Sequence, residues 1–262
     1  MILRSALPVV ASLTLLTAFS LTGQTVSGLR ADASTTTAMP QPPPPPLVSS
    51  ETRGDIFMAK KMYREAIEEY KDCPPDSAVI MNKTGIAYHQ MLDLNDAKRY
   101  YQRAIKTDPR YAEAINNLGT IEYTRKNYRR AVGLYKKAIR LAPKSASIYS
   151  NLGTGYFARK DYRAATEAFE TALQLDPEVF EHKSSHGVLL QERTVEERAK
   201  YHYYLAKMYA KAGTRDRALL YIRKALEEGF KDKKKFQEDP EFSSMRDLPE
   251  FKELLAMDHH VL

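Results

Sequence analysis

A spacing of 34 residues runs through the middle of this 262-residue chain and constrains its fold more than any other feature. Gly85, Gly119 and Gly153 follow one another at that distance, and four further kinds of position keep the same register. These positions hold Ala97, Ala131 and Ala165; Tyr101, Tyr135 and Phe169; Ala104, Ala138 and Ala172; and Pro109, Pro143 and Pro177. Small residues, an aromatic residue and a closing proline at this period are typical of a helix-turn-helix repeat. Such repeats stack on their neighbours, so the pattern predicts an all-α solenoid.

The apolar residues within each repeat recur three and four positions apart, which is the spacing of amphipathic helices. We therefore expect two helices in each repeat. The periodic glycines should lie on the first helix, where the second helix crosses closely and a side chain would push the two apart. The periodic aromatic residues are expected to fill the space between adjacent repeats as part of the core. The periodic prolines should end the second helices, because proline removes a backbone donor.

One repeat carries a longer motif. Residues 112–119 read Ala-Glu-Ala-Ile-Asn-Asn-Leu-Gly, and the positions that follow supply Tyr128, Ala131, Tyr135, Ala138 and Pro143. At these positions the chain resembles the tetratricopeptide repeat family, and we expect an exported member of bacterial type. The resemblance implies a right-handed α-solenoid of about five repeats. Their expected ranges are 47–77, 78–111, 112–145, 146–179 and 199–230.

The last repeat is displaced from the period. Ala165 and Ala218 are 53 residues apart, which predicts an insertion at residues 180–198 before that repeat. The insertion ends in Thr-Val-Glu-Glu at 194–197, which has the spacing of a capping box. We therefore expect a long helix that starts at Thr194 and ends near Lys211.

The solenoid is expected to span residues 49–230, and residues 231–262 follow it with two pieces that begin at Pro240 and Pro249. A terminal repeat would leave an apolar edge in water, so solenoids end in atypical capping segments. Residues 231–262 are therefore predicted to form C-terminal capping helices.

The first 33 residues are predicted to be a signal peptide. Arg4 gives a positive start, Ala6–Leu21 is mostly apolar, and Ala-Asp-Ala at 31–33 has the small-x-small pattern of a cleavage site. An uncleaved N-terminal anchor is the alternative, although the apolar run is short and polar for a spanning helix. Either reading places the protein in the periplasm, in the medium or on a membrane facing the cell exterior.

Residues 34–48 are rich in proline, serine and threonine and contain five successive prolines at 42–46. Such a run forms an extended rod without internal hydrogen bonds. We expect a disordered linker that acts as a spacer between the N-terminal segment and the repeats.

The chain lacks a Gly-rich phosphate loop, a G-x-S-x-G motif and a thiolate metal site. His182 and His186 have the spacing of two helical metal ligands, but the serines between them and Gly187 favour a loop. Cys73 stands where later repeats have alanine, which indicates a buried structural thiol. We therefore expect no metal, no cofactor and no enzymatic activity.

The formal net charge is +7, and basic residues are dense in the third repeat. They are Arg125, Lys126, Arg129, Arg130, Lys136, Lys137 and Arg140. Their scatter along the outer helix surface, without stacking aromatics, favours a solvated face over nucleic-acid binding. Weak attraction to anionic lipid or to an envelope polymer is the further possibility for this face.

In the family that the chain resembles, the first helices of successive repeats line a concave groove for an extended peptide or a partner helix. Carrying that register over gives thirteen candidate residues for a peptide-binding groove. They are Asn82, Ile86, His89, Asn116, Asn117, Thr120, Tyr123, Ser150, Asn151, Thr154, Phe157, Tyr203 and Lys207. Asparagine could pair with a peptide backbone and the aromatic rings could receive apolar side chains. Asparagine at 117 and 151 also has a structural interpretation in such repeats.

The family's clamp for a C-terminal carboxylate needs basic residues where this chain has Ser147 and Asn151, so a receptor for chaperone tails is disfavoured. We therefore hypothesise a non-enzymatic scaffold or adaptor in the cell envelope that binds a peptide or helix of a partner protein. The alternative is a tethered structural module that binds an envelope polymer through its basic convex face.

Overall fold

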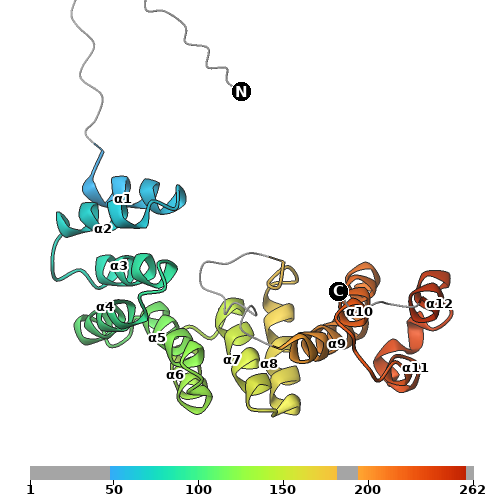
Figure 1. Ribbon diagram of the computed structural model, residues 1–262. Coiled ribbons are helices and arrows are strands. Elements are labelled where there is room, and N and C mark those ends of the chain that lie inside the picture. Colours follow the sequence, from blue (N-terminus) through green and yellow to red (C-terminus); the bar gives the residue numbers. More distant parts are fainter. Residues whose placement is uncertain (1–47, 182–193, 258–262) are drawn as a thin grey trace, which may run out of the picture. The chain divides into compact units, whose positions relative to one another are not determined.

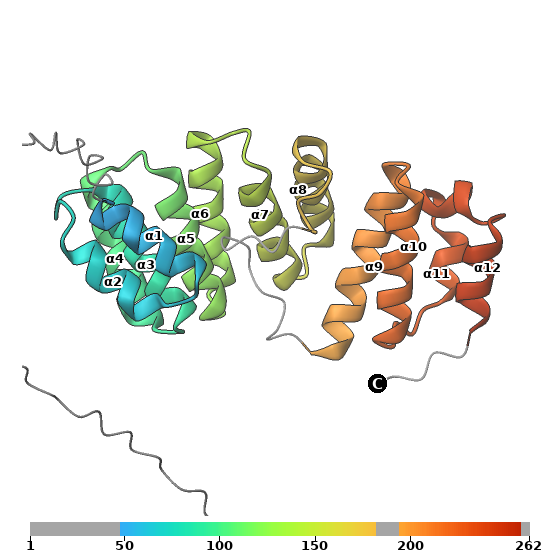
Figure 2. The same cartoon turned by 90° about the horizontal axis from the view of Figure 1, so that it is seen from above.

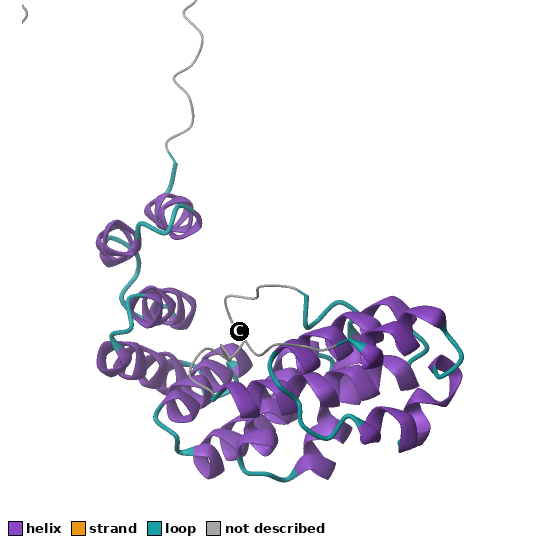
Figure 3. Ribbon diagram, turned by 45° about the vertical axis from the view of Figure 1, so that its right-hand side comes forward, coloured by secondary structure: helices purple, strands orange, loops and turns teal. Residues whose placement is uncertain are grey.

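The computed structural model describes residues 48–181 and 194–257, and every regular element in these ranges is a helix (Figures 1 and 3). The expected signal peptide, nearly all of the linker and most of the insertion lie outside the described residues. The same is true of His182, His186 and the histidine pair at 259–260. The expected all-α class is confirmed for the described part of the chain.

Ten of the helices form five pairs. The first helices are α1 (Ser50–Ala59), α3 (Ala78–Gln90), α5 (Ala112–Thr124), α7 (Ala146–Ala158) and α9 (Val195–Lys211). The second helices are α2 (Tyr63–Lys71), α4 (Leu94–Thr107), α6 (Tyr128–Leu141), α8 (Tyr162–Leu175) and α10 (Arg215–Glu227). Each first helix packs on the second helix of its own pair, and each second helix contacts the first helix that follows, as the rows of helices in Figure 2 show. The fold is a repeat solenoid.

In the first four pairs, the two helices cross at a glycine of the first helix. A Cβ added to Gly85 would lie 2.7 Å from Cε1 of Tyr101, and one added to Gly153 would lie 2.4 Å from Cδ1 of Phe169. The expected close crossing is therefore confirmed. The periodic aromatic rings were expected to fill the space between repeats. Instead, each of them packs mainly against the glycine of its own helix pair. Tyr135 also reaches the next repeat, where its ring would meet a Cβ on Gly155 at 3.5 Å.

The turn between the two helices of a pair contains a residue with a left-handed backbone. Lys61, Leu92, Lys126 and Lys160 have φ between 60° and 63°, and Gly213 takes the same role at φ 75°. Glycine adopts this conformation freely, whereas other residues pay about 1 kcal/mol or more because of their Cβ. Four of these five turns therefore carry local strain.

Helix α9 begins as the sequence predicts. Thr194 Oγ1 accepts a hydrogen bond from the Glu197 N–H at 3.2 Å, and the Thr194 N–H donates to Glu197 Oε2 at 3.3 Å. This capping box satisfies two N–H groups that would otherwise lack partners at the helix start. The prediction of a helix from Thr194 to Lys211 is confirmed.

The chain then forms α11 (Lys234–Glu238), the 3-10 helix η2 (Pro240–Met245) and α12 (Pro249–Ala256). Phe236, Phe242 and Phe251 from these three elements are between 0% and 2% exposed and join one apolar cluster with residues of α9 and α10. These short helices therefore cover the apolar edge of the last helix pair. We call them the C-terminal cap.

Candidate functional site

Four asparagines connect the first helices of three successive repeats. Asn117 Nδ2 on α5 donates to Asn82 Oδ1 on α3 at 3.0 Å. Asn151 Nδ2 on α7 donates to Asn116 Oδ1 on α5 at the same distance. Each bond spans 35 residues of sequence, so both recur with nearly the repeat period. We call these four side chains the asparagine ladder.

The ladder is continuous and buried. Asn116 Nδ2 donates to Asn117 Oδ1 at 3.3 Å, and Asn82 Nδ2 donates to the hydroxyl of Tyr111 at 3.3 Å. All four asparagines are between 1% and 3% exposed. A buried carboxamide without partners would cost about 1–3 kcal/mol, so these bonds hold the three helices in one register. The structural interpretation of the asparagines therefore applies at 117 and 151, and extends to 82 and 116.

Two of the predicted groove hydroxyls, both from threonine, donate to backbone carbonyls of their own helix. Thr120 Oγ1 donates to the carbonyl of Asn116 at 3.3 Å, and Thr154 Oγ1 donates to the carbonyl of Ser150 at 2.9 Å. Both threonines are buried. Their hydroxyls therefore have hydrogen-bond partners within the same helix, as threonine hydroxyls in helices commonly do.

The predicted groove aromatics pack among other rings. Tyr123 is 8% exposed and lies with its ring centroid 5.2 Å from that of Tyr128. Phe157 is 4% exposed and meets the rings of Tyr162 and Tyr204 edge-on at 5.3 Å and 5.8 Å. Phe157 therefore joins α7 to α8 and α9 as a core residue.

Tyr203 and Lys207 were predicted to line the groove on the first-helix face, but they contact the C-terminal cap. The Tyr203 hydroxyl donates to Asp239, and Lys207 Nζ lies 2.8 Å from Asp239 Oδ2. The Tyr203 ring also stacks on Phe230 at 4.5 Å. Burial alone would raise the pKa of Asp239, but the bonds from Lys207 and Tyr203 outweigh it and lower the pKa. The prediction extended the repeat register across the insertion. Beyond the insertion, however, α9 faces the C-terminal cap.

Ile86, His89 and Ser150 are the remaining candidates, and all three are partly exposed. His89 Nδ1 lies 3.5 Å from the Tyr101 hydroxyl, and burial lowers the pKa of His89. Ser150 lies on α7 one turn before Thr154. Of the thirteen predicted residues, these three combine a position on the first-helix face of α3 and α7 with solvent access.

The buried carboxylate of Glu122 was not predicted from the sequence. It is 1% exposed, and its Oε1 lies 2.8 Å from Lys98 Nζ while its Oε2 accepts from Asn127 Nδ2 at 3.0 Å. Burial alone would raise the pKa of Glu122, but Lys98 and Asn127 outweigh that effect and lower it. Lys98 belongs to the preceding repeat, so Glu122 joins α4 to the start of α6. No local motif marks a pair separated by 24 residues.

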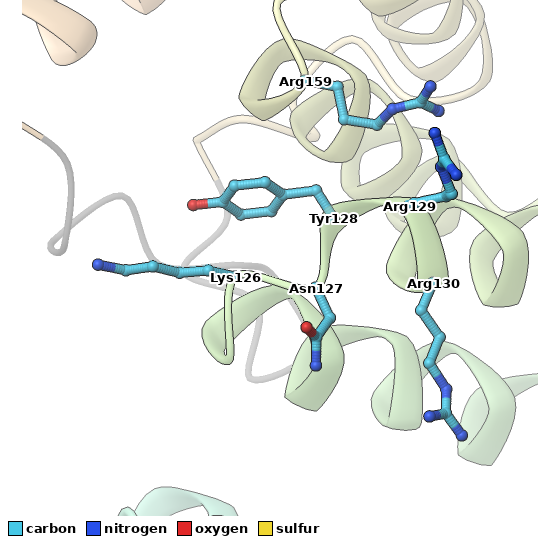
Figure 4. Close-up of a pocket in the computed structure, with 6 residues that line it drawn as sticks. All are labelled: Lys126, Asn127, Tyr128, Arg129, Arg130 and Arg159. Atoms are coloured by element: carbon cyan, nitrogen blue, oxygen red, sulfur yellow. The ribbon is translucent and has the colours of Figure 1, made fainter.

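A basic pocket opens where the helix turns of two repeats meet (Figure 4). Its volume is about 590 Å³. Its lining residues are Lys126, Asn127, Tyr128, Arg129, Arg130 and Arg159. Sequence reasoning treated Lys126, Arg129 and Arg130 as part of a solvated face. It missed Arg159, which the next repeat contributes.

Within the described residues, no group of three or more histidine, cysteine, aspartate or glutamate side chains is placed to hold a metal ion. Cys73 is buried at 9% exposure, and burial raises the pKa of its thiol. No helix in the described part of the chain is long and apolar enough to cross a membrane.

Two family models match the part of the chain that holds the ladder and the basic pocket. Both describe the tetratricopeptide repeat, one over residues 82–146 and the other over residues 146–179. The chain is a tetratricopeptide repeat protein. Such repeats form protein-interaction scaffolds and are generally not enzymes.

Solved structures of MamA resemble this tetratricopeptide repeat protein. A crystal structure of MamA is 25% identical over 67% of this chain and 93% of that chain, with a TM-score of 0.46. MamA from Desulfovibrio magneticus RS-1 is 20% identical over 68% of this chain and 92% of that chain, with a TM-score of 0.47. No curated protein sequence matches the chain.

Proposed function

We propose that this tetratricopeptide repeat protein is an exported scaffold that binds an extended segment of a partner protein along the first-helix face of α3, α5 and α7. The asparagine ladder is the observation that carries this proposal. It bonds α3 to α5 and α5 to α7 through buried carboxamides. A face held in one register before binding loses less entropy when a ligand arrives, so preorganisation favours affinity.

The exposed part of the face supplies the contacts. Ile86 offers an apolar surface, His89 a ring nitrogen and Ser150 a hydroxyl, and each is partly exposed. A partner segment would therefore meet a shallow, mixed surface. Such a surface suits modest affinity, on the order of 1 μM.

Export is part of the proposal and is supported by the sequence of the first 33 residues, with the envelope as the site of action. The proline-rich stretch that follows would separate the repeats from the export signal or anchor. A partner of this scaffold would then be an envelope or extracellular protein.

The test is recovery of partners from an envelope extract with the full-length protein as bait. The variant Ile86→Ala/His89→Ala/Ser150→Ala removes the partly exposed side chains of the first-helix face. Alanine at Asn117, Tyr123 or Phe157 is unsuitable, because those buried side chains hold the fold. We expect the triple variant to lose a partner that the wild type recovers.

The matched control is Gln102→Ala/Lys106→Ala/Lys137→Ala, which truncates three exposed side chains on the second helices α4 and α6. Equal partner recovery by the wild type and both variants would show that the first-helix face does not bind the partner. Partners lost with the control alone would assign binding to the opposite face.

A further inference from the structure

The basic pocket is lined by residues of the turn after α5, of the start of α6 and of the end of α7. Figure 4 shows Arg129 at the start of α6 and Arg159 at the end of α7 with their guanidinium groups on one side, while Lys126 and the Tyr128 ring extend to the other. No acidic side chain lines the pocket. We propose that this pocket binds an acidic segment of a partner protein, through carboxylates received by Arg129, Arg159 and Lys126.

Three of the four cations of the pocket have no acidic partner in the part of the chain that the structure describes. Within residues 48–181 and 194–257, Lys126, Arg129 and Arg159 form no ion pair. Arg130 alone among the lining cations has an acidic neighbour, Glu122, whose Oε1 lies 3.7 Å from its Nε. Three cations around one hollow repel one another unless an anion lies between them, so the pocket favours a ligand with several negative charges.

The position of these cations is unfavourable for the helix that carries them. Arg129 and Arg130 occupy the first turn of α6, which contains no acidic residue. Positive charge at a helix N-terminus opposes the helix dipole and destabilises the helix by about 0.3–1 kcal/mol per residue. Asn127 gives this helix no side-chain cap, whereas Asp161 caps α8 by accepting from the Ala164 N–H at 3.3 Å. Helix stability therefore does not explain Arg129, whereas a bound anion would.

Arginine and lysine in this arrangement suit carboxylates. A guanidinium group presents two parallel N–H donors that match the two oxygens of a carboxylate, and lysine adds a point charge. Arg129 and Arg159 would take one acidic side chain, and Lys126 a second one on the far side of the Tyr128 ring. The ligand is thus a segment with at least two acidic residues and a short spacer.

A nucleic acid fits the pocket less well than an acidic peptide. Single-stranded nucleic acids are held by a groove that follows the backbone and by several rings that stack on successive bases. This pocket has one ring, Tyr128, and that ring already packs against Tyr123 at 5.2 Å. The cations also gather around one hollow rather than along a stripe.

The experiment measures fluorescence anisotropy of a labelled oligoglutamate peptide with the full-length protein, beside an oligoglutamine peptide of the same length. The pocket variant is Arg129→Gln/Arg159→Gln. The control is Lys137→Gln/Arg140→Gln, which removes the same charge from exposed positions further along α6. Circular dichroism of all variants verifies that they fold.

We expect binding of oligoglutamate but not of oligoglutamine, a loss of affinity of about tenfold or more in the pocket variant, and less than about twofold in the control. Equal losses in both variants would show diffuse electrostatic attraction and overturn the pocket. So would tighter binding of single-stranded DNA or polyphosphate, abolished by the same pocket substitutions, because the site would then serve a polyanion other than a protein.

Discussion

A Cβ added to Gly119 would lie 2.6 Å from Cε1 of Tyr135, closer than any real side chain tolerates. Tyr135 is fully buried, so its ring has no space into which it could withdraw. The same relation joins a glycine of the first helix to an aromatic ring of the second helix in the neighbouring repeats. Each of the first four repeats therefore requires a residue without a side chain at this position.

Gly119→Ala should lower the free energy of unfolding by about 1–3 kcal/mol, because overpacking outweighs the better helix propensity of alanine. Gly133→Ala is the matched control, since Gly133 lies on the neighbouring helix α6 with no atom within 4 Å of an added Cβ. That control should be stabilised by about 0.5–1 kcal/mol. Urea unfolding measures both. A Gly119→Ala protein as stable as the control would contradict the close crossing.

The ladder predicts a coupling between Asn82 and Asn117. Asn117→Ala leaves Asn82 Oδ1 and Asn116 Nδ2 buried with fewer partners, which should cost about 1–3 kcal/mol. Asn82→Ala should cost a similar amount, and the double variant should cost less than the sum by about 1 kcal/mol or more. A double-mutant cycle measured by urea unfolding gives this coupling free energy. Strict additivity would mean that the two side chains do not depend on each other.

Much of this fold is readable from sequence, because the features that determine it are local or periodic. The glycine-aromatic crossing follows from positions 16 residues apart that recur in the first four repeats. The start of α9 follows from a capping box within four residues, Thr194 to Glu197. Such signals depend on the chain's own spacing and hardly on what surrounds them.

The candidate site is less readable, because it depends on burial. An asparagine on the first-helix face looks the same in sequence whether it meets a ligand or another asparagine. Asn82 and Asn117 form such a pair across two repeats. Likewise, the register identifies Tyr203 as a groove residue, but the insertion before α9 alters what that helix faces. Arg159 joins the basic pocket only because two turns 34 residues apart meet in space.

The strained turns predict an easy stabilisation. Leu92 is 79% exposed and has φ 62°, so its side chain gains little from burial while its backbone is strained. Leu92→Gly should raise the free energy of unfolding by about 0.5–1 kcal/mol, after the greater flexibility of glycine in the unfolded chain is taken into account. Gly213→Ala, in the corresponding turn with φ 75°, should lower it. Thermal melts of the two variants should shift in opposite directions, and shifts of the same sign would contradict the argument.

Two partly buried histidines predict how stability depends on pH. Burial lowers the pKa of His89, and it lowers the pKa of His202 even though Glu228 at 2.7 Å acts in the opposite direction. In the unfolded chain, both residues regain a pKa near 6.5. The unfolded state therefore binds more protons than the folded state below about pH 7, and stability falls as the pH is lowered through this range.

Urea unfolding at about pH 7 and pH 5 should show this loss, with at most about 1.4 kcal/mol per pH unit for each histidine. His89→Gln should make the dependence shallower. Glu122 and Asp239 act in a separate, more acidic window, because their lowered pKa values make stability fall only as carboxylates become protonated. Stability that stays constant from pH 7 to pH 5 would contradict the histidine assignment.

The C-terminal cap should be indispensable for solubility. Phe236, Phe242 and Phe251 are between 0% and 2% exposed, and they cover apolar side chains of α9 and α10. Removal of residues 231–262 would leave that cluster in water, where an exposed apolar edge promotes association. We expect the truncated protein to aggregate during size-exclusion chromatography. Asp239→Asn, which weakens the contact with Lys207 while the phenylalanines remain, should stay soluble and melt at a lower temperature. A soluble truncation with an unchanged melting temperature would show that the cap is dispensable.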